Sequence, residues 1–95
     1  RVKYFDWDEE KNQWLKKERK ISFEMIINYL EEEKILDKVV HPNSQKYPNQ
    51  FIFIVEHDNY AYLVPFIEDD EKIFLKTIIP SRKATEKYLR RPNNE

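Results

Sequence analysis

Two adjacent cations, Arg82 and Lys83, stand where the sequence predicts the start of a helix. They follow an apolar run, a proline, and Ser81, which has the side chain of a helix N-cap. The first helical turn already presents free N–H groups and the positive end of the helix dipole, so acidic residues are favoured there rather than cations. A guanidinium, an ammonium and backbone amides together suit a phosphate group. These three residues are therefore a candidate anion site, with the alternative that Glu86 pairs with Arg82 on the helix surface.

The same helix carries further positive charge toward its end. Lys87, Arg90 and Arg91 fall in the final turns, where the helix dipole favours a cation by roughly 0.3–1 kcal/mol. The simplest interpretation of these three is a solvated face that stabilises the helix. Lys87 nevertheless lies four residues after Lys83 and shares its face at 100° per residue, so it is retained as a candidate phosphate contact.

Two residues elsewhere in the chain could assist chemistry at a bound phosphate. Lys76 alternates with Phe74 and Ile78 in a predicted strand. A lysine between apolar neighbours either extends its ammonium to the sheet edge or, in an open cleft, adds charge to the anion site. His41 ends another predicted strand at a Pro-Asn loop. It is either a surface histidine or a general acid or base that works near neutral pH.

The composition excludes several kinds of site. The 95 residues include no cysteine, which excludes disulfides, thiolate catalysis and cysteine-ligated metals. They include no glycine, which excludes a glycine-rich phosphate loop and leaves Asp and Asn to supply any positive φ in the predicted turns at 57–59 and 68–71. Neither His41 nor His57 has a second histidine at ligand spacing, so we predict no metal and no cofactor. No apolar run is long enough to cross a bilayer, and a cytoplasmic location is the simplest expectation.

Charge is segregated along the chain, although the net charge is only −1 at pH 7. Residues 72–91 carry seven cations against one glutamate, a net +6, and residues 11–20 carry five against one, a net +4. Acidic residues gather elsewhere, at 6–10, 31–33 and 68–71. The two basic blocks could form one patch for a polyanion if the fold brings them together.

The first third of the chain predicts a short strand and two helices. Asp6 with Glu9 resembles a capping box that starts the first helix. Ser22 has the side chain of an N-cap for the second. The apolar stripe of this second helix falls at i, i+3, i+4 and i+7, the period of an amphipathic helix: Phe23, Ile26, Ile27 and Leu30. Trp7 and Trp14, one heptad apart, are expected in the core.

The rest of the chain predicts strands and a final helix. Four segments rich in β-branched and aromatic residues are separated by turns: 35–40, 51–55, 60–67 and 72–79. Pro65 indicates a bulge or an edge. One face of the final helix should pack on the sheet: Ala84, Thr85, Tyr88 and Leu89. We expect a single α+β domain over residues 1–95, in the order β-α-α-β-β-β-β-α, with an antiparallel sheet of about four to five strands.

Both ends of the chain resemble a known family. Residues 5–12, Phe-Asp-Trp-Asp-Glu-Glu-Lys-Asn, and residues 21–24, Ile-Ser-Phe-Glu, resemble the opening motif of the BrnT-type toxins. Residues 78–85, Ile-Ile-Pro-Ser-Arg-Lys-Ala-Thr, resemble the closing motif of that family. The expected order of elements also agrees, so the resemblance spans nearly the whole chain, with the middle matching in pattern.

The resemblance implies a RelE-like fold and a ribonuclease toxin that is held inactive by a cognate antitoxin, which usually carries a DNA-binding domain. Such toxins cleave RNA without metal, by attack of the ribose 2′-oxygen on the adjacent phosphate. By position, Arg82 and Lys83 would bind or polarise the phosphate, and His41 lies near a loop histidine of the family. Lys46 would replace a cation of the family's middle loop.

The leading hypothesis is therefore a metal-independent endoribonuclease toxin of a type II toxin–antitoxin pair. Its expected catalytic residues are Arg82, Lys83, His41 and Lys76, and its expected RNA contacts are Ser81, Arg82, Lys83, Lys87 and Lys46. One alternative is a non-catalytic module on the same fold that binds RNA or a protein. A second is a structural interaction domain that uses the acidic turns and apolar faces.

Overall fold

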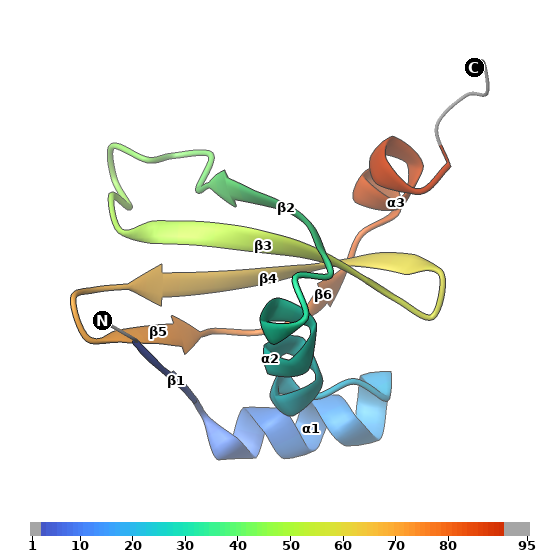
Figure 1. Ribbon diagram of the computed structural model, residues 1–95, viewed down its shortest axis with the longest axis horizontal. Helices are drawn as coiled ribbons and strands as arrows, with labels where there is room; N and C mark the ends of the chain where they lie inside the picture. The colour runs from blue at the N-terminus through green and yellow to red at the C-terminus, as the bar shows by residue number, and fades with distance from the viewer. Residues whose placement is uncertain (1–2, 91–95) are drawn as a thin grey trace.

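A computed structural model describes residues 3–90, in which a six-stranded sheet is combined with three helices (Figure 1). In chain order the elements are β1 (Tyr4–Trp7), α1 (Glu9–Arg19), α2 (Phe23–Glu31), β2 (Ile35–Val40), β3 (Gln50–His57), β4 (Tyr60–Glu68), β5 (Lys72–Leu75), β6 (Ile79–Pro80) and α3 (Arg82–Tyr88). In space the strands run β1-β5-β4-β3-β2, and β6 also pairs with β4. The predicted α+β class is confirmed.

The sheet differs from the expected one in two ways. β1 pairs with β5 in parallel, beginning with Tyr4 opposite Lys72, so the sheet is mixed rather than antiparallel. The predicted strand 72–79 is two strands, β5 and β6, which residues 76–78 separate. The order of the described elements is thus β-α-α-β-β-β-β-β-α, with one strand more than predicted.

Pro65 accounts for the break between β5 and β6. It lies in the middle of β4, opposite Ile52 of β3. Its carbonyl accepts a hydrogen bond from the Lys76 N–H at 2.8 Å, so its nitrogen, which carries no hydrogen, faces the same side. β5 pairs with β4 only after Pro65 in sequence, and β6 only before it. At the proline, the strand pairing on the β5–β6 side of β4 is interrupted, so this point of β4 is a local edge within the sheet.

The larger core lies between the sheet and helices α1 and α2. Phe53 and Phe66 stack in its centre, with ring centroids 4.1 Å apart. The predicted apolar stripe of α2 faces this core, with Phe23 and Ile26 fully buried. Other fully buried members come from both layers: Leu15, Val55, Val64, Leu75 and Ile78.

A second, smaller core lies on the opposite face, under α3. Ala84 packs with Ile54 and Ala61 of the sheet, and Tyr88 and Leu89 pack against them, as the sequence predicted for this helix face. The helices therefore cover both faces, with α1 and α2 on one and α3 on the other. Within residues 3–90, no helix has the length and apolar character needed to cross a membrane.

Trp14, which was predicted in the core, lies on the surface. It is 43% exposed, and the charged groups of Lys11 and Arg19 are 4.7 and 4.9 Å from its ring centroid. Trp7 is half-buried and stacks on Phe23, with 5.8 Å between centroids. The prediction failed because Trp7 belongs to β1, so the helical period does not relate the two tryptophans.

The helices begin at polar caps, one of them two residues later than predicted. Asp8, not Asp6, caps α1: its side chain accepts from the Glu10 N–H at 3.0 Å, while Asp6 lies in β1. The predicted caps Ser22 and Ser81 are confirmed, because each side chain accepts a backbone N–H three residues ahead.

Lys20 ends α1 in the left-handed region, with φ of 58° and ψ of 33°. Glycine adopts this conformation without the clash that a Cβ causes. Lys20→Gly is therefore expected to raise the free energy of unfolding by about 1 kcal/mol. Urea denaturation followed by circular dichroism measures the change. The control is Lys17→Gly inside α1, which should lower the same free energy by about as much; a loss of stability in Lys20→Gly would contradict the cap geometry.

Candidate nucleic-acid interface

Thr85 fixes the start of α3 to the sheet. Its side chain is fully buried, and its hydroxyl accepts a hydrogen bond from the Ala61 N–H of β4 at 2.8 Å. The same hydroxyl donates to the Ser81 carbonyl at 2.7 Å. The Ser81 N–H in turn donates to the Ala61 carbonyl at 3.0 Å. One residue of β4 thus holds the first turn of α3 through both of its backbone polar groups.

Tyr88 fixes the far end of α3 to the edge strand β2. Its hydroxyl donates to Asp37 Oδ2 at 2.6 Å. This hydrogen bond lowers the pKa of the Asp37 carboxyl below its usual value, and the backbone N–H of Lys38 adds to the effect. The same contact raises the pKa of Tyr88. The carboxylate and the neutral phenol therefore stay paired across neutral pH, and α3 is held at both ends.

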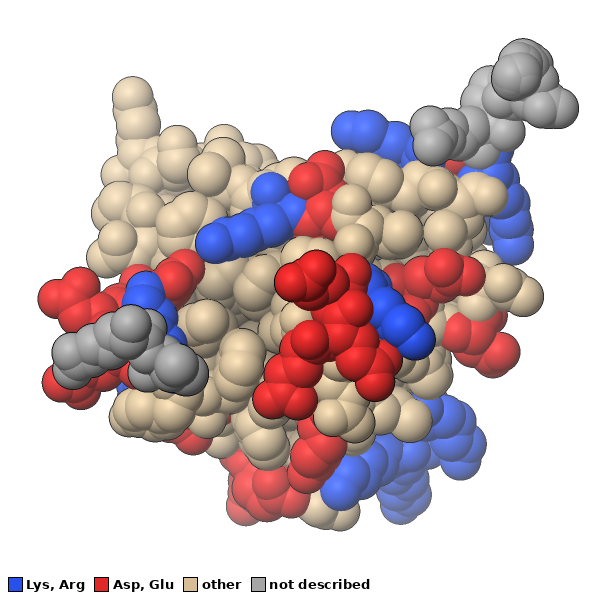
Figure 2. All heavy atoms as spheres, in the orientation of Figure 1, with Lys and Arg blue, Asp and Glu red and all other residues tan. Residues whose placement is uncertain are grey.

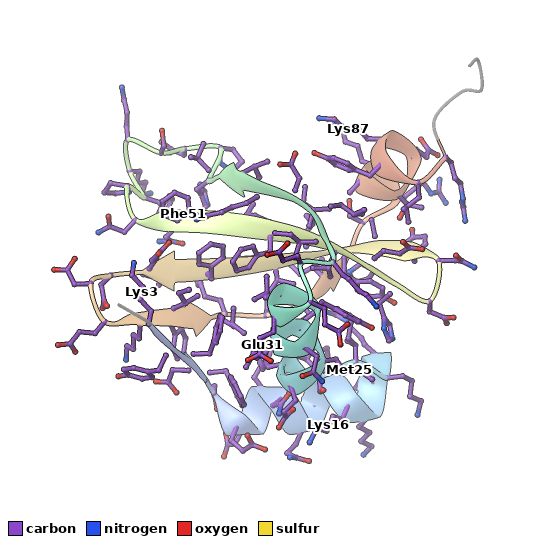
Figure 3. All side chains as sticks on the ribbon, viewed as in Figure 1. Lys3, Lys16, Met25, Glu31, Phe51 and Lys87 are labelled. Carbon is purple, nitrogen blue, oxygen red and sulfur yellow. The ribbon has the colours of Figure 1, made fainter. Side chains whose placement is uncertain are left out.

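A groove of about 420 Å³ lies between α3 and the sheet. Its floor is apolar and comes from three strands: Val39, Ile54 and Leu63. Lys83 and Lys87 line it from α3, one helical turn apart, with Ala84 and Tyr88 beside them. Figure 3 shows the Lys87 side chain extending from α3 toward the β2 side of the molecule. The groove can hold an anionic group and an apolar group next to each other.

Only some of the predicted phosphate-binding residues lie together in the structure. Lys83 and Lys87 line the groove together, and Ser81 lines it too. Arg82 is exposed but does not line the groove, because consecutive helical residues point about 100° apart. Arg82 and Lys83 are neighbours in the chain, yet the helix pairs Lys83 with Lys87. Arg91, the last predicted cation of this helix, lies outside the described residues.

His41 does not line the groove, but the next residue, Pro42, does. The His41 Nδ1 accepts a hydrogen bond from the Asn43 N–H at 3.0 Å, and its ring packs on Tyr47 with 4.6 Å between centroids. An accepting Nδ1 assigns the proton of the neutral ring to Nε2. In this orientation the His41 ring can donate a hydrogen bond from Nε2. Lys46 belongs to the same loop, with its Nζ 5.5 Å from the Tyr47 centroid.

Lys76 lies away from the groove. It is exposed, and its Nζ donates to Gln50 Oε1 at 3.2 Å. Ile78, predicted on the same face, is instead fully buried in the core under α1 and α2. The predicted alternation is wrong because β5 ends at Leu75, so the residues that follow are not in a strand. The structure therefore does not bring Lys76 together with the cations of α3.

The two basic blocks of the sequence do not form one patch. Residues 11–20 lie on and just after α1, on the opposite face of the sheet from α3. There Lys16 and Lys20 line a separate groove of about 290 Å³, beside Met25 (Figure 3). Figure 2 shows basic side chains in separate groups near α1 and near α3, with acidic side chains between them. Each block must therefore be considered as a site of its own.

A metal centre finds no support in the described part of the chain, where no three His, Asp or Glu side chains are grouped to hold an ion. In comparisons with known proteins, no family model, no curated protein and no solved structure matches this chain.

Proposed function

We propose that this chain is a metal-independent endoribonuclease of the toxin type, and that it grips RNA in the groove beside α3. The observation that carries the proposal is the pair Lys83 and Lys87 above an apolar floor. Ammonium groups attract the phosphates of RNA, and an apolar floor suits a base. The resemblance of residues 5–12 and 78–85 to the BrnT-type toxins supports the same activity.

The chemistry needs groups that this site can supply. The ribose 2′-oxygen attacks the adjacent phosphorus and the bond to the 5′-oxygen breaks, which leaves a 2′,3′-cyclic phosphate and a 5′-hydroxyl. Lys83 and Lys87 would stabilise the negative charge that develops on the phosphoryl oxygens. His41, next to Pro42 at the groove, would donate a hydrogen bond from Nε2 to a phosphoryl oxygen, while water takes the 2′-hydroxyl proton and protonates the leaving 5′-oxygen.

We also expect a cognate antitoxin with a DNA-binding domain as the protein partner, in keeping with the toxins that the chain resembles. An antitoxin segment that covers the apolar floor would exclude RNA from the groove. A cytoplasmic location accompanies this proposal, because both the RNA substrate and a DNA-bound antitoxin are found there.

A non-catalytic binding module on the same fold is the second candidate, and one observation favours it. The His41 ring is packed on Tyr47 and bonded to the Asn43 N–H, so it is held in its loop rather than in the groove. Lys83 and Lys87 would then hold RNA, or an acidic segment of a protein, without cleaving it.

The test is incubation of the purified chain, free of partner, with a single-stranded RNA in excess EDTA. We expect cleavage that leaves cyclic phosphate ends, and no cleavage of the same sequence with 2′-O-methyl riboses, because the methyl group blocks the nucleophile. Induced expression should also arrest growth. A folded chain that binds the RNA without cutting it would support the binding module, and one that does neither would refute both candidates.

A further inference from the structure

The sheet ends in two edge strands, β1 at one side and β2 at the other (Figure 1). Within residues 3–90, no strand pairs with the outer side of either one. An edge strand presents N–H and C=O groups without partners, and these can pair with a strand of another molecule. The outward backbone groups of β1 and β2 therefore decide whether two copies of the chain can join edge to edge.

In β2, an aspartate occupies one of the outward N–H groups. The pairing of β2 with β3 continues to His41, whose N–H donates to the Gln50 carbonyl at 3.0 Å. Alternate residues of a strand direct their polar groups to the same side, so the groups of Lys38 and Val40 point outward. Asp37 Oδ1 accepts the Lys38 N–H at 2.8 Å. The outward donor in the middle of β2 is therefore already bonded.

β1 has the same arrangement at the other side of the sheet. The Tyr4 N–H donates to the Glu71 carbonyl at 3.2 Å, on the β5 side, so the outward groups of this strand are those of Phe5 and Trp7. Asp6 Oδ1 accepts the Trp7 N–H at 2.9 Å. One of the two outward donors of β1 is therefore also bonded to the side chain of the preceding aspartate.

The second carboxylate oxygen of each aspartate is held by another element. Asp37 Oδ2 accepts the Tyr88 hydroxyl of α3 at 2.6 Å. Asp6 Oδ2 lies 3.5 Å from Lys72 Nζ of β5. Each carboxylate is thus fixed at its edge by two contacts, one to the next backbone N–H and one to a neighbouring side chain.

We propose that Asp6 and Asp37, called the edge aspartates below, prevent the sheet from pairing edge to edge with a second copy of this chain. β2 can pair with itself in antiparallel fashion about a twofold axis, which makes a second copy the natural occupant of this edge. Such a pair needs the Lys38 N–H as a donor, and Asp37 already holds it. Val40, 58% exposed at the end of β2, would add an apolar contact to the pair.

The faces of the sheet, rather than its edges, are then the surfaces left for partners. This inference does not rest on the proposed function, because neither edge aspartate lines the groove beside α3.

The test measures the mass of the chain by sedimentation equilibrium over a range of concentrations. Asp37→Ala frees the Lys38 N–H and is expected to associate at least about tenfold more tightly than the wild type. Its mass should level off at two chains, because only one edge is opened. Asp6→Ala/Asp37→Ala opens both edges and should grow beyond two chains. Amide exchange measured by NMR locates the contact: the outward Val40 N–H should exchange more slowly in the Asp37→Ala dimer than in the wild type.

Three further variants separate the N–H contact from other effects of the substitution. Asp37→Asn keeps an acceptor oxygen for the Lys38 N–H and should associate no more than the wild type. Tyr88→Phe frees Asp37 from α3 but keeps the carboxylate, so it should associate less than Asp37→Ala. Asp70→Ala, the matched control, removes the same charge from the exposed β4–β5 turn and should have no effect.

Four results would overturn the role of the edge aspartates. The first is an Asp37→Ala protein that associates no more than the wild type. The second is equal association of Asp37→Ala and any of the three other variants. The third is association of Asp37→Ala without slower exchange at Val40, because loosely folded protein would aggregate in that way. The fourth is slow exchange at the Val40 N–H in the wild type, because that edge would then be paired already.

Discussion

Alanine at both Lys83 and Lys87 is expected to lower RNA cleavage at least 100-fold and to leave the fold intact. Loss of one group that stabilises charge in the transition state costs roughly 10²–10³ in rate, and two such groups are removed here. Both side chains are exposed, so the melting temperature should change little. The slope of log affinity against log salt should become shallower by about 1.4, the value for two phosphate contacts on a single strand. Single-turnover cleavage and anisotropy titrations at several salt concentrations measure both effects.

Lys16→Ala/Lys20→Ala is the matched control for this variant. These lysines are also four residues apart and also line a groove, but they do so between α1 and α2. The loss of charge is identical, so an unspecific electrostatic effect would appear in both proteins. Equal effects, or unchanged cleavage without Lys83 and Lys87, would show that RNA does not bind beside α3. Arg82→Ala should have a smaller effect than the double variant, because Arg82 does not line the groove.

Thr85→Val is expected to lower the free energy of unfolding by about 2–3 kcal/mol, although the two side chains have nearly the same shape. The buried hydroxyl accepts from the Ala61 N–H and donates to the Ser81 carbonyl. Valine does neither, so the Ala61 N–H is left buried without an acceptor, which costs roughly 1–3 kcal/mol. Urea denaturation measures the change. RNA cleavage should fall as well, because the lysines of α3 lose their fixed position above the sheet.

Two substitutions control for the loss of the hydroxyl. Thr85→Ser keeps the hydroxyl and should keep most of the stability. Thr77→Val alters the other threonine of the chain, which is half-buried between β5 and β6, and should change stability by no more than about 0.5 kcal/mol. A Thr85→Val protein as stable as the wild type would mean that these hydrogen bonds do not hold α3 to the sheet.

Elements with local signals could be predicted from the sequence. The spacing of apolar residues in α2 and the caps Ser22 and Ser81 are properties of a few neighbouring residues, and the structure confirms them. The β3–β4 turn also has a local sequence signal. With no glycine in the chain, Asp58 and Asn59 adopt φ of 57° and 64°, and these are the residue types that tolerate such values best.

Pairings between distant segments could not be predicted. The parallel pairing of β1 with β5 joins residues 4–7 to residues 72–75, and neither segment carries a local mark of its partner. The break at residues 76–78 depends on Pro65 in the neighbouring strand, not on any residue within the break. Trp14 was predicted in the core because a helical period was assumed to relate it to Trp7. Trp7 instead belongs to β1 and stacks on Phe23, a contact that the fold sets.

The candidate site was predicted in part, for a related reason. Lys83 and Lys87 were both predicted as phosphate contacts. Whether Arg82 or Lys87 lines the groove together with Lys83 depends on which face of α3 packs on the sheet. Ala84 and Tyr88 pack toward the sheet, so the lysine directly before each of them lies beside the packed face and lines the groove. A cation directly before a residue that packs on the sheet, repeated four residues later, is the sequence pattern that indicates the groove.

The interruption at Pro65 divides the molecule into parts that can open separately. β5 and β6 pair with β4 on either side of it, so loss of the β6 pairing leaves the β5 pairing intact. β6 is only Ile79–Pro80, and α3 is attached to the sheet by the hydrogen bonds of Ser81, Thr85 and Tyr88 and by the small core around Ala84. β6 and α3 therefore form a cooperative unit that can unfold below the global free energy of unfolding. The groove exists only while this unit is closed. A ligand bound there therefore stabilises the closed state, and its apparent affinity depends on the fraction of molecules in which the groove is formed.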